Sequence, residues 1–393
     1  MRNNASITLI ATFLLVVSTC LAQTGGYHLK FTLSKQNFVD SIRISFEHGQ
    51  VFVPVTIGSN TYNFLLDTGA SNAVIYDDTP IDGCLPAGHI TTHDAVGHKD
   101  TVQLLTLPPF TIGTLTLSGC QATLQHRAVK RRHIDGILGF DLVCKGLQMK
   151  IDVRQQLLIL TDQKNYFDRE SGYETRYRLN YHVPYINIKP FTKYEERVLF
   201  DTGSRQLYSM NKQSFDRAEQ KVKDIITPQI EGRSIGRHAM GHSGTESLGE
   251  VVFLALDSLQ LGGFSFRNVH LVTTQGGSHV GARLLEYGAV VFNPRRKRIR
   301  FQPYSEHAYC TVDNEQLQKA IVNDGGHPTI GLVWEHSEAY QAGLREGDVL
   351  IKADDRNIGT FDDYVNFRPL RGHYYKFTVR DKRGFLKEVT MKW

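Results

Sequence analysis

The tripeptide Asp-Thr-Gly occurs twice in the sequence, beginning at Asp67 and at Asp201. Each copy follows a run of apolar residues, which predicts a buried strand that ends at the aspartate. A carboxylate in that position is costly to bury unless it receives hydrogen bonds. The threonine hydroxyl can supply one, and glycine allows neighbouring backbone N–H groups to approach. We therefore expect two satisfied, buried carboxyl groups, one in each half of the chain.

If the two loops meet, their carboxyl groups share a single proton, because two adjacent carboxylates do not both ionise easily. The ionised member can take a proton from a water held between them, while the protonated member donates to a carbonyl oxygen. That chemistry hydrolyses a peptide bond without a metal or a covalent intermediate. A single Asp-Thr-Gly is most often a turn after a strand, whereas the paired occurrence favours a functional site.

An internal duplication must position the two aspartates. A strand, a polar turn and a second strand precede each Asp-Thr-Gly, and glycine-hinged hairpins follow at residues 111–117 and 260–266. Further glycine landmarks, at residues 136–139 and 279–281, each precede another hairpin. These landmarks recur in the same order, which predicts two β-rich units of about 130–145 residues. Period-two apolar alternation dominates both units, so the predicted fold class is mostly β.

The first 305 residues resemble a single-chain, bilobal aspartic protease of the pepsin/retropepsin-like group. That group's signature, two apolar residues before Asp-Thr-Gly-Ser/Ala, is matched at residues 65–70 and 199–204. Its second landmark, two apolar residues and a glycine, is matched fully at residues 137–139 and in part at 279–281. The resemblance implies two β-barrel-like lobes of an acid-protease fold, a catalytic pair formed by Asp67 and Asp201, and loops braced by their threonines. The implied supporting residues are Thr68, Gly69, Ala70, Thr202, Gly203, Ser204, Gly139 and Gly281.

The sequence departs from the group's pattern at the loops and at the predicted flap. Ala70 lacks the hydroxyl that Ser204 retains, which predicts a higher pKa for Asp67 and activity in milder acid. The charge of Arg205 opposes that trend. Residues 91–99 contain no tyrosine. Either His93 or His98 replaces it, or this segment is a solvated hairpin tip.

The pattern changes near residue 310. A strand at residues 328–334 is followed by a short helix that ends at Gly343, a turn at residues 346–348 and a buried strand. Residues 310–393 resemble a PDZ domain of bacterial type, a small β-sandwich or barrel with one or two short helices. The resemblance implies capture of a peptide C-terminus at a sheet edge. No carboxylate-binding loop is identifiable at residues 325–328. A purely structural role for this domain, without peptide binding, is therefore an equally supported alternative.

The predicted domain organisation includes an N-terminal targeting segment. Residues 1–22 combine Arg2, an apolar run and small residues near Ala22, which predicts a secretory signal peptide. A retained anchor and lipidation at Cys20 are the alternatives, so the expected location is exported: periplasmic, secreted or lipid-anchored. The other predicted units are an N-terminal lobe at 23–162, a C-terminal lobe at 163–305 and the PDZ-like domain at 310–393.

Composition excludes several other classes. The net charge of +5 over 393 residues is too small to indicate a nucleic-acid partner. The 16 histidines show no metal-ligand spacing, so neither a metal nor another cofactor is expected. Four cysteines remain after signal cleavage, and they either pair in one of three ways or stay as buried thiols. They are Cys84, Cys120, Cys144 and Cys310.

The leading hypothesis is a monomeric, exported endopeptidase that acts on polypeptides, with the PDZ-like domain serving recognition or regulation. One alternative is a non-catalytic peptide-binding protein that keeps the bilobal groove. A second alternative is a PDZ-bearing serine hydrolase, suggested by the run Gly241-His242-Ser243-Gly244. No histidine and aspartate pattern accompanies that serine, so a glycine-rich flap is the favoured interpretation.

Overall fold

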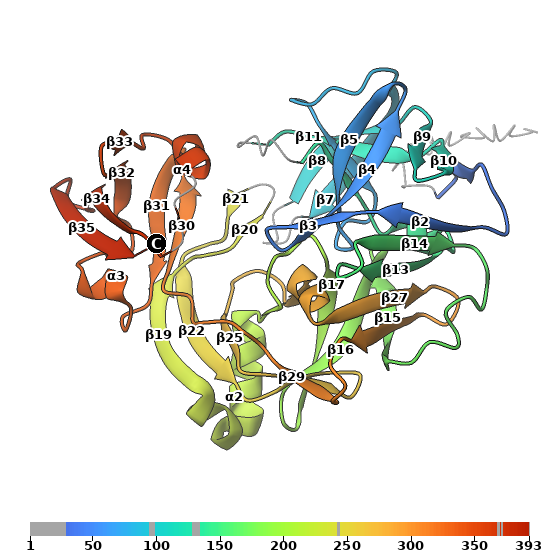
Figure 1. Ribbon diagram of the computed structural model, residues 1–393. Helices are drawn as coiled ribbons and strands as arrows, with labels where there is room; N and C mark the ends of the chain where they lie inside the picture. The colour runs from blue at the N-terminus through green and yellow to red at the C-terminus, as the bar shows by residue number, and fades with distance from the viewer. Residues whose placement is uncertain are drawn as a thin grey trace, which may run out of the picture.

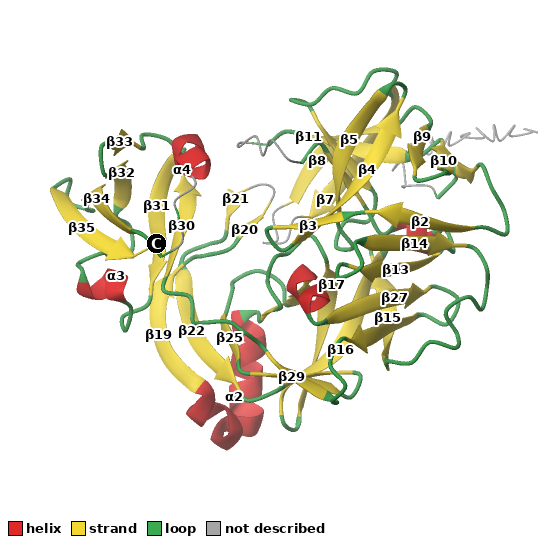
Figure 2. Cartoon of the chain, viewed as in Figure 1, coloured by secondary structure: helices red, strands yellow, loops and turns green. Residues whose placement is uncertain are grey.

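The computed structural model describes residues 29–93, 99–127, 134–241, 244–367, 370 and 372–392 (Figure 1). Strands predominate and most helices are short (Figure 2), so the predicted mostly β class is confirmed. The predicted signal peptide, His98 and Ser243 lie outside the described residues. No helix within the described residues is long and apolar enough to cross a membrane.

The first half of the chain forms one large sheet in the order β1-β10-β9-β4-β5-β12-β6-β11-β8-β7, with β3 beside β4. Its remaining strands, β2, β13 and β14, pair elsewhere. The elements are β1 (Thr32–Leu33), β2 (Val39–Arg43), β3 (Ser45–Glu47), β4 (Gln50–Ile57), β5 (Asn60–Leu66), β6 (Ala73–Tyr76), β7 (Leu85–His93), β8 (Lys99–Thr106), β9 (Phe110–Ile112), β10 (Leu115–Ser118), β11 (Gln121–Gln125), β12 (Gly136–Leu138), α1 (Asp141–Cys144), β13 (Gln148–Asp152) and β14 (Leu157–Thr161).

The second half contains the longest helix, α2, which begins after its N-cap Asn211 and buries Phe215 and Ala218. Its elements are β15 (Tyr173–Asn180), β16 (Val183–Phe191), β17 (Tyr194–Asp201), β18 (Tyr208–Ser209), α2 (Lys212–Ile226), η1 (Thr227–Gln229), β19 (Ile230–Gly236), β20 (Met240–Gly241), β21 (Gly244–Thr245), β22 (Gly249–Leu256), β23 (Leu259–Leu261), β24 (Phe264–Arg267), β25 (Val269–Val272), β26 (His279–Gly281), η2 (Ala282–Glu286), β27 (Gly288–Asn293), β28 (Arg298–Pro303) and β29 (Tyr309–Thr311).

Both halves repeat one strand arrangement around their aspartate. In the first half, β12 lies parallel to β5 and antiparallel to β6. In the second half, β26 lies parallel to β17 and antiparallel to β18. The two glycine-hinged hairpins expected from the sequence are β9–β10 and β23–β24. The duplication inferred from sequence is therefore present in three dimensions.

A sheet shared by the two halves fixes their relative position. Strand β13 of the first half pairs antiparallel with β27 of the second, with Ile151 opposite Val290. Strands β14 and β2 extend this sheet on one side, and β28 and β15 extend it on the other (Figure 1). The ring of Phe292 packs edge-on against both Phe140 and Phe200, at centroid distances of 5.3 and 5.4 Å. Buried aromatic contacts of this kind hold the two aspartate-bearing loops in one rigid frame.

The C-terminal elements form a separate small sheet in the order β30-β31-β32-β34-β35, with its own buried core. The helix α3 begins after Ser337, whose hydroxyl accepts a hydrogen bond from the Tyr340 N–H, and it ends before Gly343, where φ is +100°. The elements are β30 (Lys319–Asp324), β31 (His327–Val333), α3 (Glu338–Gln341), β32 (Val349–Ala353), β33 (Arg356–Asn357), α4 (Phe361–Phe367), β34 (Tyr374–Arg380) and β35 (Leu386–Lys392). Its identity as a PDZ domain stays a prediction.

This C-terminal unit packs against the second half, beside β19 and β22 (Figure 1). The Trp334 ring lies 6.0 Å from that of Phe253, and the Arg237 N–H donates to the Gly331 carbonyl over 2.8 Å. The strand β29, near the expected start of this unit, instead pairs with β24 of the second half. The small sheet itself begins only at β30.

The four described cysteines form no disulfide with one another. Cys120 is buried and the other three are partly buried. Burial raises the pKa of the Cys144 thiol to about 12 and that of the Cys310 thiol to about 11. In this structure the cysteines are therefore protonated thiols, one of the two alternatives left open by the sequence.

Candidate active site

Asp67 and Asp201 lie at the ends of equivalent strands, where the two halves meet. Asp67 directly follows β5, and Asp201 is the last residue of β17. Their carboxyl groups form a hydrogen bond with each other. The duplicated fold thus brings together two residues that are far apart in the sequence.

Asp201 is buried and Asp67 is partly buried, and their carboxyl groups act as a unit. Burial, and then the adjacent Asp201 carboxyl, raise the pKa of Asp67 well above its ordinary value. Burial also raises the pKa of Asp201, although hydrogen bonds from Asp67 and from two backbone N–H groups partly offset that effect. A pair of this kind keeps one shared proton into milder acid than an isolated aspartate would.

Backbone donors surround each carboxyl group in nearly the same way. The Gly69 N–H donates to Asp67 Oδ1 over 2.8 Å, and the Ala70 N–H does so over 3.2 Å. In the second loop, the corresponding distances to Asp201 Oδ1 are 2.9 Å and 3.3 Å, from Gly203 and Ser204. These donors favour the ionised carboxylate and compensate for its removal from water.

Glycine is required in both loops because the backbone at each glycine lies directly against the aspartate of the other loop. A Cβ atom at Gly69 would lie 2.7 Å from the Asp201 carboxyl carbon. A Cβ atom at Gly203 would lie 2.5 Å from that of Asp67. Any side chain at either position would force the two carboxyl groups apart.

The two threonines connect the loops reciprocally. The Thr68 hydroxyl donates to the Phe200 carbonyl over 2.7 Å and accepts the Thr202 N–H over 3.0 Å. The Thr202 hydroxyl donates to the Leu66 carbonyl over 2.7 Å and accepts the Thr68 N–H over 3.0 Å. Both side chains are buried. Each loop is therefore held in place by the other lobe.

The glycine landmarks lie beneath the loops. Gly281 pairs with Asp201 across the parallel strands, and the Asp67 N–H donates to the carbonyl before Gly139 over 2.9 Å. A Cβ atom at Gly139 would lie 2.6 Å from the Asn72 carbonyl oxygen, and one at Gly281 would lie 2.3 Å from that of Gln206. The backbone beneath each loop is packed too closely for a side chain.

The Ser204 hydroxyl does not donate to Asp201 in this structure. It lies 2.9 Å from His279 Nε2 instead, and the other ring nitrogen, Nδ1, lies 3.0 Å from the Gly277 carbonyl oxygen. Desolvation lowers the pKa of His279, which favours a neutral ring. The hydroxyl that distinguishes Ser204 from Ala70 therefore does not act on the aspartate pair, contrary to the prediction from sequence. The raised pKa of Asp67 follows from burial and from Asp201, not from the missing hydroxyl.

Arg205 is held by a residue that sequence reasoning did not identify. Gln50, buried at the start of β4, accepts hydrogen bonds from Arg205 Nε and Nη2 over 3.0 and 2.9 Å. Its own amide donates to the Gly203 carbonyl over 2.8 Å. This contact connects the first lobe to the second catalytic loop. A single glutamine outside any motif carries no signal that could have identified it from sequence.

The predicted flap is the hairpin formed by β7 and β8, which pair as far as His93 opposite Lys99. Its tip, residues 94–98, lies outside the described residues, so the choice between a histidine contact and a solvated tip stays open. In the second half, Met240 pairs with Thr245 in the short hairpin β20–β21. Among the described residues, no group of three or more His, Cys, Asp or Glu side chains is arranged to hold a metal ion.

Residues 53–142, which include the first Asp-Thr-Gly loop, match the family model described as Aspartyl protease. A search of the curated proteins found no match. Among solved structures, the aspartic proteinase from Irpex lacteus is 15% identical, with 68% of this chain and 98% of that chain covered and a TM-score of 0.43. Basic 7S globulin from soybean is 11% identical, with 69% and 96% covered and a TM-score of 0.44.

The family match and the geometry of the site lead to the same class. An aspartate pair, provided by two duplicated β lobes and surrounded by backbone donors, can supply both the acid and the base for amide hydrolysis. The match of residues 53–142 to the Aspartyl protease model, together with this aspartate pair, supports an aspartic-type peptidase.

Proposed function

We propose that the protein is an endopeptidase that cleaves polypeptides with a water molecule activated between Asp67 and Asp201. The observation that carries this proposal is the hydrogen bond between two carboxyl groups, one from each lobe. Such a pair holds one proton and one negative charge at the same time. It therefore contains both the base and the acid that amide hydrolysis needs.

In the proposed reaction, the ionised carboxylate takes a proton from the water, whose oxygen forms a bond to the substrate carbonyl carbon. The other carboxyl group donates its proton to the carbonyl oxygen, which gives a neutral tetrahedral intermediate. The carboxyl group that took the water proton then donates it to the amide nitrogen as the C–N bond breaks, while the other carboxylate takes a proton from one hydroxyl of the intermediate. The carboxylic acid and amine products leave, and the pair again holds one proton.

The test uses the full chain and a library of quenched fluorescent peptides, assayed from about pH 3 to pH 8 across the ordinary aspartate pKa. Internal cleavage, inhibited by a statine-type transition-state mimic, is the expected result. Resistance to that mimic combined with loss of activity after a serine-directed reagent would favour the serine hydrolase. Binding of peptides without turnover would favour the non-catalytic peptide-binding protein.

The proposal extends to export and to the C-terminal unit. We infer that residues 1–22 direct export of a monomer, which N-terminal sequencing and light scattering of the mature protein test directly. A new N-terminus at Gln23 is expected, and an intact Met1 would contradict signal cleavage.

The C-terminal unit is proposed to bind a peptide C-terminus and to communicate with the second lobe. Communication with the second lobe is favoured by contacts that connect the C-terminal unit to the region of the hairpin β20–β21. Arg237 pairs with Asp324 over 2.6 Å, and the Thr245 hydroxyl donates to the Asn323 carbonyl over 2.8 Å. Peptides with a free C-terminal carboxylate should bind more tightly than their amidated forms and should change the cleavage rate. Equal binding of both forms would leave the unit a structural appendage.

A further inference from the structure

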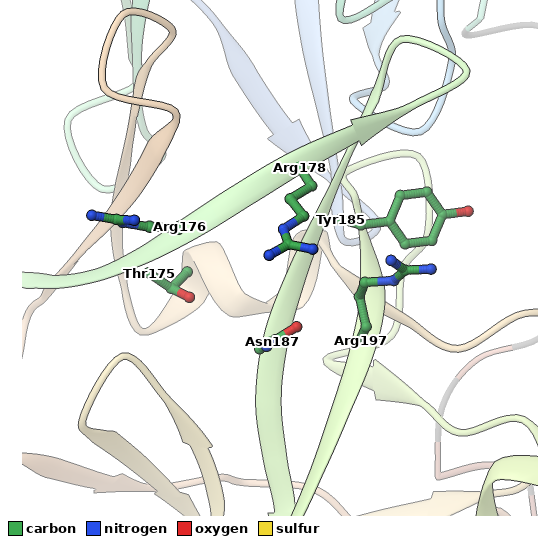
Figure 3. Close-up of a pocket in the computed structure, with 6 residues that line it drawn as sticks. All are labelled: Thr175, Arg176, Arg178, Tyr185, Asn187 and Arg197. Carbon is green, nitrogen blue, oxygen red and sulfur yellow. The ribbon is translucent and has the colours of Figure 1, made fainter.

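Three arginines surround a cavity of about 550 Å³ on the second lobe, on strands β15, β16 and β17. The six lining residues are Thr175, Arg176, Arg178, Tyr185, Asn187 and Arg197. Figure 3 shows Arg178 above the space between the strands and Arg197 next to the Tyr185 ring. The Arg197 guanidinium lies 5.8 Å from the centre of that ring, which holds a cation without neutralising it.

These guanidinium groups lack acidic partners. Within the part of the chain that the structure describes, Arg176, Arg178 and Arg197 form no ion pair with a carboxylate. The adjacent strand β28 is different, because Arg298 and Arg300 both bind Glu174 there.

Glu195, the carboxylate nearest to Arg197 on the same face of β17, already accepts a hydrogen bond. Glu195 precedes Arg197 by two residues, and its Oε1 accepts a hydrogen bond from the Asn187 amide over 2.5 Å. Within the described residues, the cavity arginines therefore have no carboxylate in ion-pair contact.

The cavity lies on the strand face that leads to the catalytic pair. Residues 197, 199 and 201 alternate onto one face of β17, and the intervening Val198 and Phe200 are buried in the core. The register continues this face across the sheet, with Tyr185 opposite Leu199 and Arg178 opposite Tyr185. On the other side, Leu199 pairs with His279, the residue that contacts Ser204. The face therefore runs from the arginines to the Asp201 loop without interruption.

Strand geometry gives the distance between the arginines and the dyad. Arg197 and Asp201 are separated by four steps along β17, or about 13 Å at the usual rise per residue. An extended peptide has the same rise, so about four of its residues span this distance. An arginine side chain can reach part of the way towards the dyad, which lowers the number to as few as about two.

We propose that Arg178 and Arg197, supported by Tyr185, form a subsite that binds an acidic side chain of the polypeptide substrate. The acidic residue lies about two to four positions from the scissile bond, on one side only. Guanidinium groups recognise carboxylates through paired N–H donors, and a planar stacked arginine loses little freedom when it does so. This inference rests on the proposed endopeptidase function and specifies the class of substrate that it takes.

The experiment places Glu or Gln in turn at each of the four positions on either side of the bond in one cleaved peptide. The value of kcat/KM is measured at about pH 5.5, where a peptide glutamate is ionised, at low ionic strength. We expect Glu to be preferred over Gln by about 3- to 10-fold at positions on one side of the bond. The preference should weaken as salt is added, because the site is open to solvent.

A double variant, Arg178→Gln with Arg197→Gln, should remove this preference, so that kcat/KM for the Glu peptides falls to the value for the Gln peptides. Both side chains are exposed, so the variant is expected to fold. The matched control is Arg383→Gln, an exposed arginine of the C-terminal unit that changes the net charge by one. The single variant Arg197→Glu should reverse the preference towards Lys.

The outcomes separate the two claims. If no peptide is cleaved, the proposed endopeptidase function fails and this inference falls with it. If peptides are cleaved but Glu and Gln are equivalent, only the acidic subsite is wrong. A Glu preference that survives in the double variant, or that is equal on both sides of the bond, would also overturn the subsite.

Discussion

The two catalytic loops are almost identical in their backbone contacts and different in their side-chain contacts. Gly69 and Gly203 donate to their aspartates over 2.8 and 2.9 Å, and the two threonine exchanges have equal lengths. In the second loop, Ser204 contacts His279 and Arg205 contacts Gln50, which are both distant in the sequence. In the first loop, the fourth residue is Ala70, and the Ser71 hydroxyl at the fifth position donates to the amide oxygen of the adjacent Asn72. The comparison indicates that backbone groups and threonines build the dyad, while the other side chains attach the second loop to its surroundings.

The largest expected effect comes from the aspartates themselves. Asp67→Asn and Asp201→Asn should each lower kcat/KM by at least about 10³-fold, because a neutral amide cannot accept the proton of the water. The exposed Asp257→Asn is the control and should keep full activity. Peptide cleavage is measured alongside circular dichroism. If one of the two variants retained most of the activity, the loops would not be functionally equivalent.

Removal of one threonine hydroxyl should be the next largest effect. Thr68→Val and Thr202→Val each leave a buried N–H and a buried carbonyl of the other lobe without a partner. We expect each to lower the free energy of unfolding by about 2–4 kcal/mol, measured by denaturant titration. Thr56→Val on the exposed face of β4 is the control. Unequal losses for the two loop variants would contradict the symmetry of the brace.

A smaller effect is expected at the asymmetric contact. Gln50→Ala removes the amide donor to Gly203 and the acceptor of Arg205, which should cost about 1–2 kcal/mol of unfolding free energy. The exposed Gln155→Ala serves as its control. A variant as stable as the unmodified protein would show that this contact does not hold the second loop.

The smallest effect is expected when the second loop is made like the first. Ser204→Ala should change kcat/KM by less than about 3-fold, the range of one neutral hydrogen bond at a partly exposed site. Its pH profile should not move, because the hydroxyl contacts His279 and not Asp201. A displaced acidic limb would show that the hydroxyl acts on the dyad after all.

Much of the fold could be predicted from the sequence because the determining signals are local. Apolar alternation, the glycine-hinged hairpins and the two Asp-Thr-Gly loops each depend on a few neighbouring residues. The mostly β class and the duplicated strand arrangement follow from them. In the C-terminal unit, the helix that ends before Gly343 was predictable for the same reason.

The contacts that the sequence did not reveal depend on long-range packing. Gln50 reaches the second loop only because β4 lies beside it in the folded protein, and Ser204 finds His279 through the parallel pairing of β17 with β26. The unpaired arginines near Tyr185 belong to three separate strand positions with no shared motif. Such residues become neighbours only through the register of the sheet.

The dependence of kcat/KM on pH, measured from about pH 3 to pH 8, tests the shared proton most directly. Activity should fall at high pH as the pair loses its one proton, and at low pH as the remaining carboxylate is protonated. Because the pKa of Asp67 is raised well above its ordinary value, the account predicts a bell-shaped profile whose alkaline limb lies above about pH 4. Two limbs that both lie in stronger acid, or a rate that keeps rising through neutral pH, would contradict it.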